Sequence, residues 1–261
     1  MRSLIKEIDQ LLTGLKGKRL YLFLDYDGTL APIARTPAKA KLSEEMRRTL
    51  RNISQNPLIK PVIVTGRSLP DIKNKVKLPS LTYAGNHGLE MDKSGIYVNF
   101  AREYDYKDAI KGLERELRGN FKSIKGVLLE NKGLALAVHY RLVAPDKVPA
   151  LKQIFDDNVR PYLGRNKFKV RTGKKVLELV PAVNWNKGKF VKWLMNTVLT
   201  NNAGTNAFYF GDDLTDEDAF KALGAKAYTV LVGKPRDSAA RYYLLNSREV
   251  AAVLNKLAKT I

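Results

Sequence analysis

The sequence of 261 residues contains no cysteine and only two histidines, His87 and His139. The lack of cysteine excludes disulfide bonds, thiolate metal sites and cysteine nucleophiles. Two histidines are too few for a multi-histidine zinc site. The sequence also lacks any apolar run near the ~20 residues that a membrane span needs, and residues 1–18 alternate apolar and charged residues, unlike a secretory signal. We therefore expect a cytoplasmic protein with no membrane partner.

The chain has few acidic residues relative to basic ones: 46 Lys and Arg against 26 Asp and Glu, a net charge of +20. Such a balance is one mark of a nucleic-acid-binding protein. Here the basic residues are spread over the whole chain, without a long basic run or an aromatic platform. This distribution argues against nucleic acid as a partner and equally suits solubility or the attraction of small anionic substrates.

The two ends of the chain show alternating strand and helix patterns. The continuous apolar run at residues 20–24 predicts a strand buried on both faces, and Ser43 is a suitable N-cap for a helix over residues 43–54. Residues 4–15 have apolar residues at the spacing of an amphipathic helix. The alternation predicts an α/β fold with a Rossmann-like parallel-sheet core and helices on both faces. Its other predicted strands are 61–64, 81–84, 207–210 and 227–232, and its other helices are 187–198 and 217–223.

The middle of the chain follows a different order, α-β-β-α-β-β. Helices are predicted near 105–118 and 146–162, and strands near 127–129, 134–140, 167–171 and 176–180. The first two strands are separated by residues 130–133, which are predicted to form a hairpin turn. We expect an inserted α+β cap domain over residues 104–181, with residues 1–103 and 182–261 forming the core. Candidate hinges lie at residues 102–105 and 180–183.

The strongest chemical signal is the run Asp25-Tyr26-Asp27-Gly28-Thr29. Two carboxylates two residues apart in an extended segment point to the same face. They follow a predicted buried strand, at the end where open α/β sheets bind ligands. Two buried like charges call for a cation to offset them. An acidic turn after a strand is the structural alternative.

Three further polar groups occur in a fixed order at the ends of apolar runs. Thr65-Gly66-Arg67 follows one predicted strand, Lys187 opens a predicted helix, and Asp212, Asp213 and Asp216 follow another strand. Considered one at a time, each group has a structural interpretation. Thr65 would be a turn residue and Lys187 a solvated cation, and the three acids would begin a helix, where they suit the helix dipole. Together they indicate one site of carboxylates, a hydroxyl and a lysine.

This order of motifs resembles that of the haloacid dehalogenase superfamily. The resemblance implies that Asp25 is a nucleophile, that Asp27 is the general acid and base, and that Thr65 and Lys187 hold the phosphoryl oxygens. It also implies a magnesium ion held by Asp25, the backbone carbonyl of Asp27, and Asp212, with water completing the octahedron.

Over nearly its whole length the chain also resembles the trehalose-6-phosphate phosphatases, which have a cap of the same kind (C2-type). The resemblance lies in residues 25–30, 64–68, 85–90, 129–133, 137–141, 173–181 and 211–219. It implies hydrolysis of trehalose 6-phosphate, the last step of trehalose biosynthesis, through an aspartyl-phosphate, with a trehalose-6-phosphate synthase as a candidate partner. The implied sugar-binding residues are Arg67, Asn86, His87, Glu130, Lys132 and Glu178.

Two alternatives stay open at this point. One is a phosphatase for a related glycosyl phosphate of the sucrose, glucosylglycerol or mannosyl-phosphoglycerate type. The other is a non-catalytic binding module with the same fold, although the presence of both Asp25 and Asp27 counts against it. Glu130 and Lys132, in a predicted turn, would ordinarily be solvated charges, and His139, among apolar neighbours, is interpreted as a packed side chain.

Overall fold

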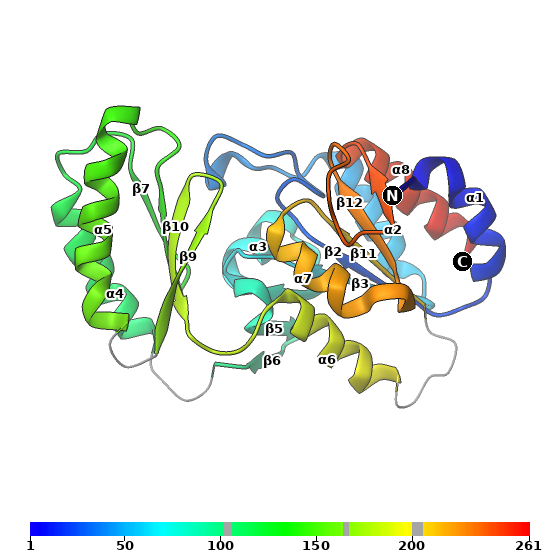
Figure 1. Ribbon diagram of the computed structural model, residues 1–261. Coiled ribbons are helices and arrows are strands. Elements are labelled where there is room, and N and C mark those ends of the chain that lie inside the picture. The colour runs from blue at the N-terminus through cyan, green and yellow to red at the C-terminus, as the bar shows by residue number, and fades with distance from the viewer. Residues whose placement is uncertain (102–105, 164–166, 200–205) are drawn as a thin grey trace. The chain divides into compact units, whose positions relative to one another are not determined.

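The computed structural model describes residues 1–101, 106–163, 167–199 and 206–261 (Figure 1). The chain divides into two compact units, one formed by Met1–Asn99 and Trp185–Ile261 and the other by Phe100–Asn184. The predicted domain borders, after residues 103 and 181, lie a few residues from these divisions. Residues 102–105, which hold one border and one predicted hinge, lie outside the described residues.

The first unit is built on a nine-stranded sheet of order β1-β13-β12-β11-β2-β3-β4-β5-β6. All neighbouring strands from β1 to β4 are parallel, which confirms the predicted parallel core, whereas β5 and β6 extend it as an antiparallel hairpin. The strands are β1 (Arg2–Ser3), β2 (Leu20–Leu24), β3 (Ile59–Val64), β4 (Thr82–Gly85), β5 (Glu90–Lys93), β6 (Ile96–Asn99), β11 (Asn206–Gly211), β12 (Tyr228–Val232) and β13 (Tyr242–Leu244).

Helices cover both faces of this sheet. Leu22 and Leu24 of β2 belong to one large core cluster with residues of α1, α2, α3 and α8, while Phe23 points the other way, where its ring stacks on Tyr209. Tyr209 in turn meets Phe220 of α7, which packs against α6. The helices are α1 (Leu4–Leu15), α2 (Glu44–Gln55), α3 (Leu69–Val76), α6 (Lys187–Leu199), α7 (Leu214–Leu223) and α8 (Ser247–Thr260), with short 3₁₀ turns η1 (Pro37–Lys39), η2 (Asn86–Gly88) and η4 (Gly224–Lys226).

Strand β2 lies between β11 and β3, so the ends of these three strands meet at one edge of the sheet. Each strand has five or six residues that are mostly apolar and buried, apart from the exposed Lys60 in β3 and the half-buried Asn206 at the start of β11. Because the strands are parallel, the residues that follow them come together at their carboxyl ends. Asp25, Thr65 and Asp212 are the residues that follow. The sheet topology alone therefore assembles the three predicted motifs.

The second unit is a four-stranded antiparallel sheet of order β7-β8-β10-β9 with two helices on one face (Figure 1). Its element order confirms the predicted α-β-β-α-β-β pattern. Leu136 and Val138 of β8 are fully buried on one face of the sheet. Ala137 lies between them and faces the other way, and Glu130 of β7, which pairs with Ala137, shares that opposite face. The elements are α4 (Tyr106–Asn120), β7 (Leu128–Asn131), β8 (Leu136–His139), η3 (Pro145–Lys147), α5 (Val148–Leu163), β9 (Phe168–Gly173) and β10 (Val176–Pro181).

The predicted hairpin turn at residues 130–133 is wrong in its position. Glu130 and Asn131 belong to β7, and the connection is closed by a hydrogen bond of 2.9 Å from Lys132 N to the Ala135 carbonyl. The ladder runs longer because Glu130 pairs with Ala137 and Asn131 with Leu136. Glu130 is thus fixed on a sheet and is not a solvated turn charge.

Candidate active site

The turn after β2 places Asp25 and Asp27 beside the end of β11. Asp25 N donates to the Phe210 carbonyl at 3.0 Å, and Gly28 N donates to the Ala31 carbonyl at 2.7 Å. Gly28 has φ +91°, and a Cβ there would lie 2.3 Å from the Asp212 carboxylate. A side chain at this position would both strain the backbone and displace Asp212. Gly28 is therefore what lets the two acidic motifs approach each other.

Lys187, the first residue of α6, lies between two buried carboxylates. Its Nζ donates to Asp25 Oδ1 at 2.6 Å and to Asp216 Oδ1 at 2.8 Å, and the side chain is 2% exposed. The interpretation of Lys187 as a solvated cation is therefore wrong. A buried ammonium with two carboxylate partners is held in one position, because moving it away would leave buried carboxylates without a counter-charge.

Asp216 organises the third motif; the sequence analysis placed it in the acidic cluster but gave it no role of its own. Its Oδ1 also accepts from the Tyr209 hydroxyl at 2.8 Å, and its Oδ2 accepts from the backbone N of Asp212 and Asp213 at 3.0 and 3.1 Å. Asp213 caps α7 through its Oδ1, which accepts from Thr215 N at 2.8 Å. The sequence signal for this role was an acidic residue four positions after Asp212. The same residue also completes a capping box with Asp213, so its position did not by itself indicate a role in the site.

One group of three acidic residues in the described part of the chain has the geometry of a cation site. Asp25, Asp212 and Asp216 each offer a carboxylate oxygen, and these atoms lie within 4.8 Å of one another. Burial raises the pKa of Asp25 well above its ordinary value, more than the neighbouring Lys187 lowers it. Burial likewise raises the pKa of Asp216, to about 6. An excess of buried carboxylates over one ammonium is stabilised by a hard divalent cation with oxygen ligands.

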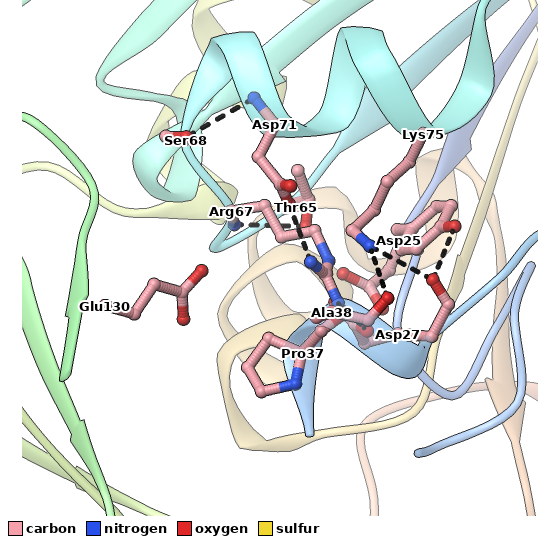
Figure 2. A network of polar contacts seen from close by, with 12 residues as sticks. Asp25, Asp27, Pro37, Ala38, Thr65, Arg67, Ser68, Asp71, Lys75 and Glu130 are labelled. Atoms are coloured by element: carbon pink, nitrogen blue, oxygen red, sulfur yellow. Dashed lines mark hydrogen bonds and ion pairs between the residues drawn. The ribbon is translucent and has the colours of Figure 1, made fainter. Parts of the chain in front are cut away.

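Thr65 and Arg67 stand at the end of β3, and Arg67 reaches Asp27 (Figure 2). Thr65 is buried, and its Oγ1 accepts from Arg67 N at 3.2 Å. The Arg67 Nε and Nη2 atoms donate to the two carboxylate oxygens of Asp27 at 2.6 and 2.7 Å. The structure thus brings this predicted sugar-binding residue to the predicted general acid, and a contact of Arg67 with the sugar stays a prediction.

Asn86 and His87 form a turn that is tied to the Thr65–Arg67 loop. Both residues have positive φ, 49° and 59°. Their backbone N atoms donate to the carbonyls of Arg67 and Thr65 at 2.7 and 2.9 Å. A Cβ on Gly66 would lie 2.7 Å from His87 Cε1, so the imidazole lies directly over that glycine. Non-glycine residues adopt this conformation at some cost, which is common at functional sites.

Glu130, Lys132 and Glu178 come together in the second unit. Lys132 Nζ donates to Glu178 Oε1 at 2.5 Å, and Glu130 and Glu178 are both in register with Ala137, so they share one face of the sheet. His139, expected to be packed, instead lies 2.7 Å from Glu130 Oε2 through its Nε2. The three predicted sugar-binding residues of this unit therefore form a polar patch, with His139 as a member that the sequence analysis missed.

Comparison with known proteins places this arrangement in a family. Residues 23–257 match the family model of trehalose-phosphatases. The chain is 34% identical to trehalose 6-phosphate phosphatase RA3 of Zea mays over 98% of this chain and 74% of that protein. It is 33% identical to trehalose-phosphate phosphatase B of Arabidopsis thaliana over 98% of this chain and 70% of that protein.

Among solved structures, the C-terminal domain of the C. albicans trehalose-6-phosphate phosphatase superposes with a TM-score of 0.80 at 26% identity. The match covers 100% of this chain and 98% of that domain. It includes both the parallel-sheet unit and the inserted unit. The chain therefore belongs to the trehalose-phosphatase family.

Proposed function

We propose that the protein hydrolyses trehalose 6-phosphate to trehalose and phosphate through an aspartyl-phosphate on Asp25. The observation that carries this proposal is the buried Lys187–Asp25 contact of 2.6 Å beside Asp27, in a chain that belongs to the trehalose-phosphatase family. A carboxylate beside a fixed cation is suited to attack on an anionic phosphate, because the cation reduces the repulsion between the two.

In the first step, a carboxylate oxygen of Asp25 attacks phosphorus, and the bond to the sugar oxygen breaks. Asp27 donates a proton to that oxygen as it leaves. Asp27 lies two residues after Asp25 and has the more exposed side chain: its exposed fraction is 40%, against 6% for Asp25. In the second step, Asp27 takes a proton from a water molecule that hydrolyses the aspartyl-phosphate. Thr65 and Lys187 hold the phosphoryl oxygens.

Asp25, Asp212 and the backbone carbonyl of Asp27 are the proposed ligands of a magnesium ion. When bound, the ion would neutralise charge on the transferring phosphoryl group. Asp216 belongs to the same acidic group, but its Oδ1 accepts from Lys187 and Tyr209 and its Oδ2 accepts from two backbone N–H groups. We infer that Asp216 orients Lys187 and Asp212 and is not itself a ligand.

The polar patch of the inserted unit, Glu130, Lys132 and Glu178, is proposed to recognise the sugar. Carboxylates accept hydrogen bonds from sugar hydroxyls and an ammonium donates to ring or bridging oxygens. Asn86 and His87 remain proposed substrate contacts on the core unit. A synthase partner, the lack of a nucleic-acid partner and a cytoplasmic location remain predictions; in the described part of the chain, no helix has the length and apolar character of a membrane span.

The test is phosphate release from trehalose 6-phosphate with magnesium, compared with sucrose 6-phosphate, mannosyl-3-phosphoglycerate and glucose 6-phosphate. We expect a clear preference for trehalose 6-phosphate, no release by Asp25→Asn, and loss of activity on chelation that magnesium restores. Preference for another glycosyl phosphate would keep the mechanism and overturn the substrate. No release from any ester, including a generic aryl phosphate, would overturn the enzymatic function in favour of a binding module.

Magnesium binding has a second readout that does not depend on turnover. A ligand that binds only the folded state stabilises it by about 2.7 kcal/mol at a concentration of 100 times its dissociation constant. We therefore expect magnesium to raise the melting temperature of the wild type and to have much less effect on Asp212→Asn. Equal shifts in the two proteins would exclude Asp212 as a ligand.

A further inference from the structure

Asp71 is a polar residue near the site to which no role has been given so far. It lies in the first turn of α3, where its backbone N donates to the Ser68 side chain at 3.4 Å. An acidic residue in a first turn suits the helix dipole. Its Oδ2 accepts from Arg67 Nη1 at 2.6 Å (Figure 2). The backbone of Asp71 is thus fixed in the first turn of α3, and its carboxylate is held by Arg67.

Arg67 is held by this contact in a single orientation. Besides Asp71, it donates from Nε and Nη2 to Asp27 and from Nη2 to the Pro37 carbonyl at 2.9 Å. These contacts use four of the five N–H groups of a guanidinium. The plane of the group is rigid, so the direction of Nη1 toward Asp71 determines where Nε and Nη2 point. The side chain of Arg67 is 6% exposed and lies over the Tyr26 ring, with 5.2 Å between Cζ and the ring centre.

We propose that Asp71 is a positioning residue for the general acid Asp27 and acts through Arg67. This inference rests on the proposed function, in which Asp27 protonates the leaving sugar oxygen. Asp71 holds one edge of the guanidinium, and the opposite edge then presents two parallel N–H groups to the carboxylate of Asp27. That pairing selects one rotamer of the Asp27 side chain, which is 40% exposed and would otherwise be free to turn into solvent.

An ordinary helix ion pair would not have these features. Exposed pairs at i, i+4 contribute little to stability and are free to separate. The Arg67–Asp71 pair has the same spacing, but its cation is buried and shared with a carboxylate 40 residues earlier in the chain. Lys75, further along α3, donates to the Ala38 and Ala40 carbonyls at 3.3 and 3.2 Å, so the helix also holds the segment that includes Pro37. Helix α3 therefore acts as the fixed frame for Arg67.

The chemistry of the leaving group separates a positioning role from a structural one. A sugar alkoxide is a poor leaving group and needs the proton from Asp27, whereas a nitrophenolate departs without one. The constant kcat/KM reports the steps up to departure of the leaving group. A misplaced Asp27 should therefore lower kcat/KM for the sugar phosphate much more than for p-nitrophenyl phosphate.

The experiment measures kcat/KM of Asp71→Asn for trehalose 6-phosphate, glycerol phosphate and p-nitrophenyl phosphate. We expect a loss of roughly 10-fold on the two alkyl esters, which is part of the ~10²–10⁴-fold that general acid catalysis contributes. On the aryl ester we expect the loss in kcat/KM to be less than about 2-fold. On the two alkyl esters we expect kcat to be reduced and KM to change little. Arg67→Lys, which keeps the charge but not the fork, should show the same pattern.

Two controls make the result decisive. Asp92→Asn breaks another ion pair of α3, Lys73–Asp92 at 3.0 Å, and should leave all three constants unchanged. In an Asp27→Asn background, Asp71→Asn should have no further effect on the aryl ester or on residual alkyl ester hydrolysis. Equal losses on alkyl and aryl esters, no loss on either, or additive effects with Asp27→Asn would overturn the proposal. A wild type active on glycerol phosphate but not on trehalose 6-phosphate would overturn the proposed substrate alone.

Discussion

At the scale of single residues, the site depends on one ammonium among several carboxylates. Burial alone would lower the pKa of Lys187, but Asp216 and Asp25 outweigh it and raise that pKa well above its ordinary value. Lys187 is therefore charged throughout the physiological pH range. It is the first residue of α6, so the helix itself fixes the Cα from which this ammonium reaches Asp25.

Lys187→Met tests how far the carboxylates depend on that charge. Breaking a buried ion pair by removing one partner costs about 3–5 kcal/mol, so we expect a loss of this size in the free energy of unfolding without magnesium. Urea denaturation measures it, and phosphate release should fall below detection. The double variant Asp25→Asn/Lys187→Met should recover part of the stability but none of the activity. Unchanged stability of Lys187→Met would show that the buried ion pairs contribute nothing net.

Tyr83 gives a prediction about alkaline pH. Its hydroxyl donates to the Leu78 carbonyl at 2.7 Å, and burial raises its pKa from 10 to about 12. Between these pH values the unfolded chain loses a proton that the folded protein keeps, so the free energy of unfolding falls as pH rises. One such group accounts for about 2 to 3 kcal/mol over that range. Tyr83→Phe should be less stable at neutral pH, where the hydrogen bond is lost, and should show a shallower decline above pH 10; an identical slope would contradict the assignment.

At the scale of elements, the N-terminal side-chain caps of helices α7 and α8 have different roles. Asp213 caps α7 next to Asp212, so that cap also shapes the acidic motif. Asn246 caps α8, accepting from Arg248 N and Glu249 N at 3.0 and 3.2 Å. Helix α8 packs on α1 and α2, among the core cluster of the opposite face. The α8 cap therefore supports the fold without touching the site.

We expect Asn246→Ala to lower the free energy of unfolding by about 1 kcal/mol and to leave kcat/KM unchanged. Asp213→Ala should cost a similar amount and also reduce kcat/KM, because the position of Asp212 depends on the first turn of α7. Thermal unfolding and steady-state kinetics on the same samples measure both effects, with Asn246→Asp as the variant that keeps a cap. A loss of activity in Asn246→Ala at temperatures where it is folded would contradict this separation.

At the scale of the whole molecule, the proposed function assigns the chemistry to one unit and part of the sugar recognition to the other. The proposed catalytic groups lie in the parallel-sheet unit, and the patch of Glu130, Lys132 and Glu178 lies in the inserted unit. Each unit has its own sheet and its own buried side chains. A change in the inserted patch should therefore alter specificity without altering the chemical step.

Glu178→Gln tests this division. It removes the charge that pairs with Lys132 but keeps a hydrogen-bonding group of the same size. We expect at least a roughly 10-fold rise in KM for trehalose 6-phosphate and an unchanged kcat/KM for p-nitrophenyl phosphate. Circular dichroism and thermal unfolding establish that the variant is folded. Equal losses of kcat/KM on the two substrates would show that Glu178 stabilises the fold and does not bind the sugar.

Many of the secondary-structure elements could be predicted from local sequence patterns. The run at residues 20–24 is strand β2 with the same bounds, and Ser43 caps α2 as expected, its Oγ accepting from Met46 N at 3.1 Å. Helix α3, with only eight residues and a proline in its first turn, carried no pattern long enough to be recognised. The antiparallel strands β5 and β6 were also missed, because their four-residue lengths include charged and polar residues.

The sequence by itself determined the parallel core, the inserted α+β unit and the meeting of Asp25, Thr65 and Asp212 at one sheet edge. It could do so because apolar runs and their periodicity are local, and parallel strands bring their ends together whatever the loops do. Only the tertiary structure decided which partner each charged side chain takes. Arg67 meets Asp27 and Asp71, Lys187 joins Asp25 to Asp216, and Glu130 lies on a strand beside His139. Such pairings depend on distances of a few ångströms between segments far apart in the chain, and no local pattern encodes those distances.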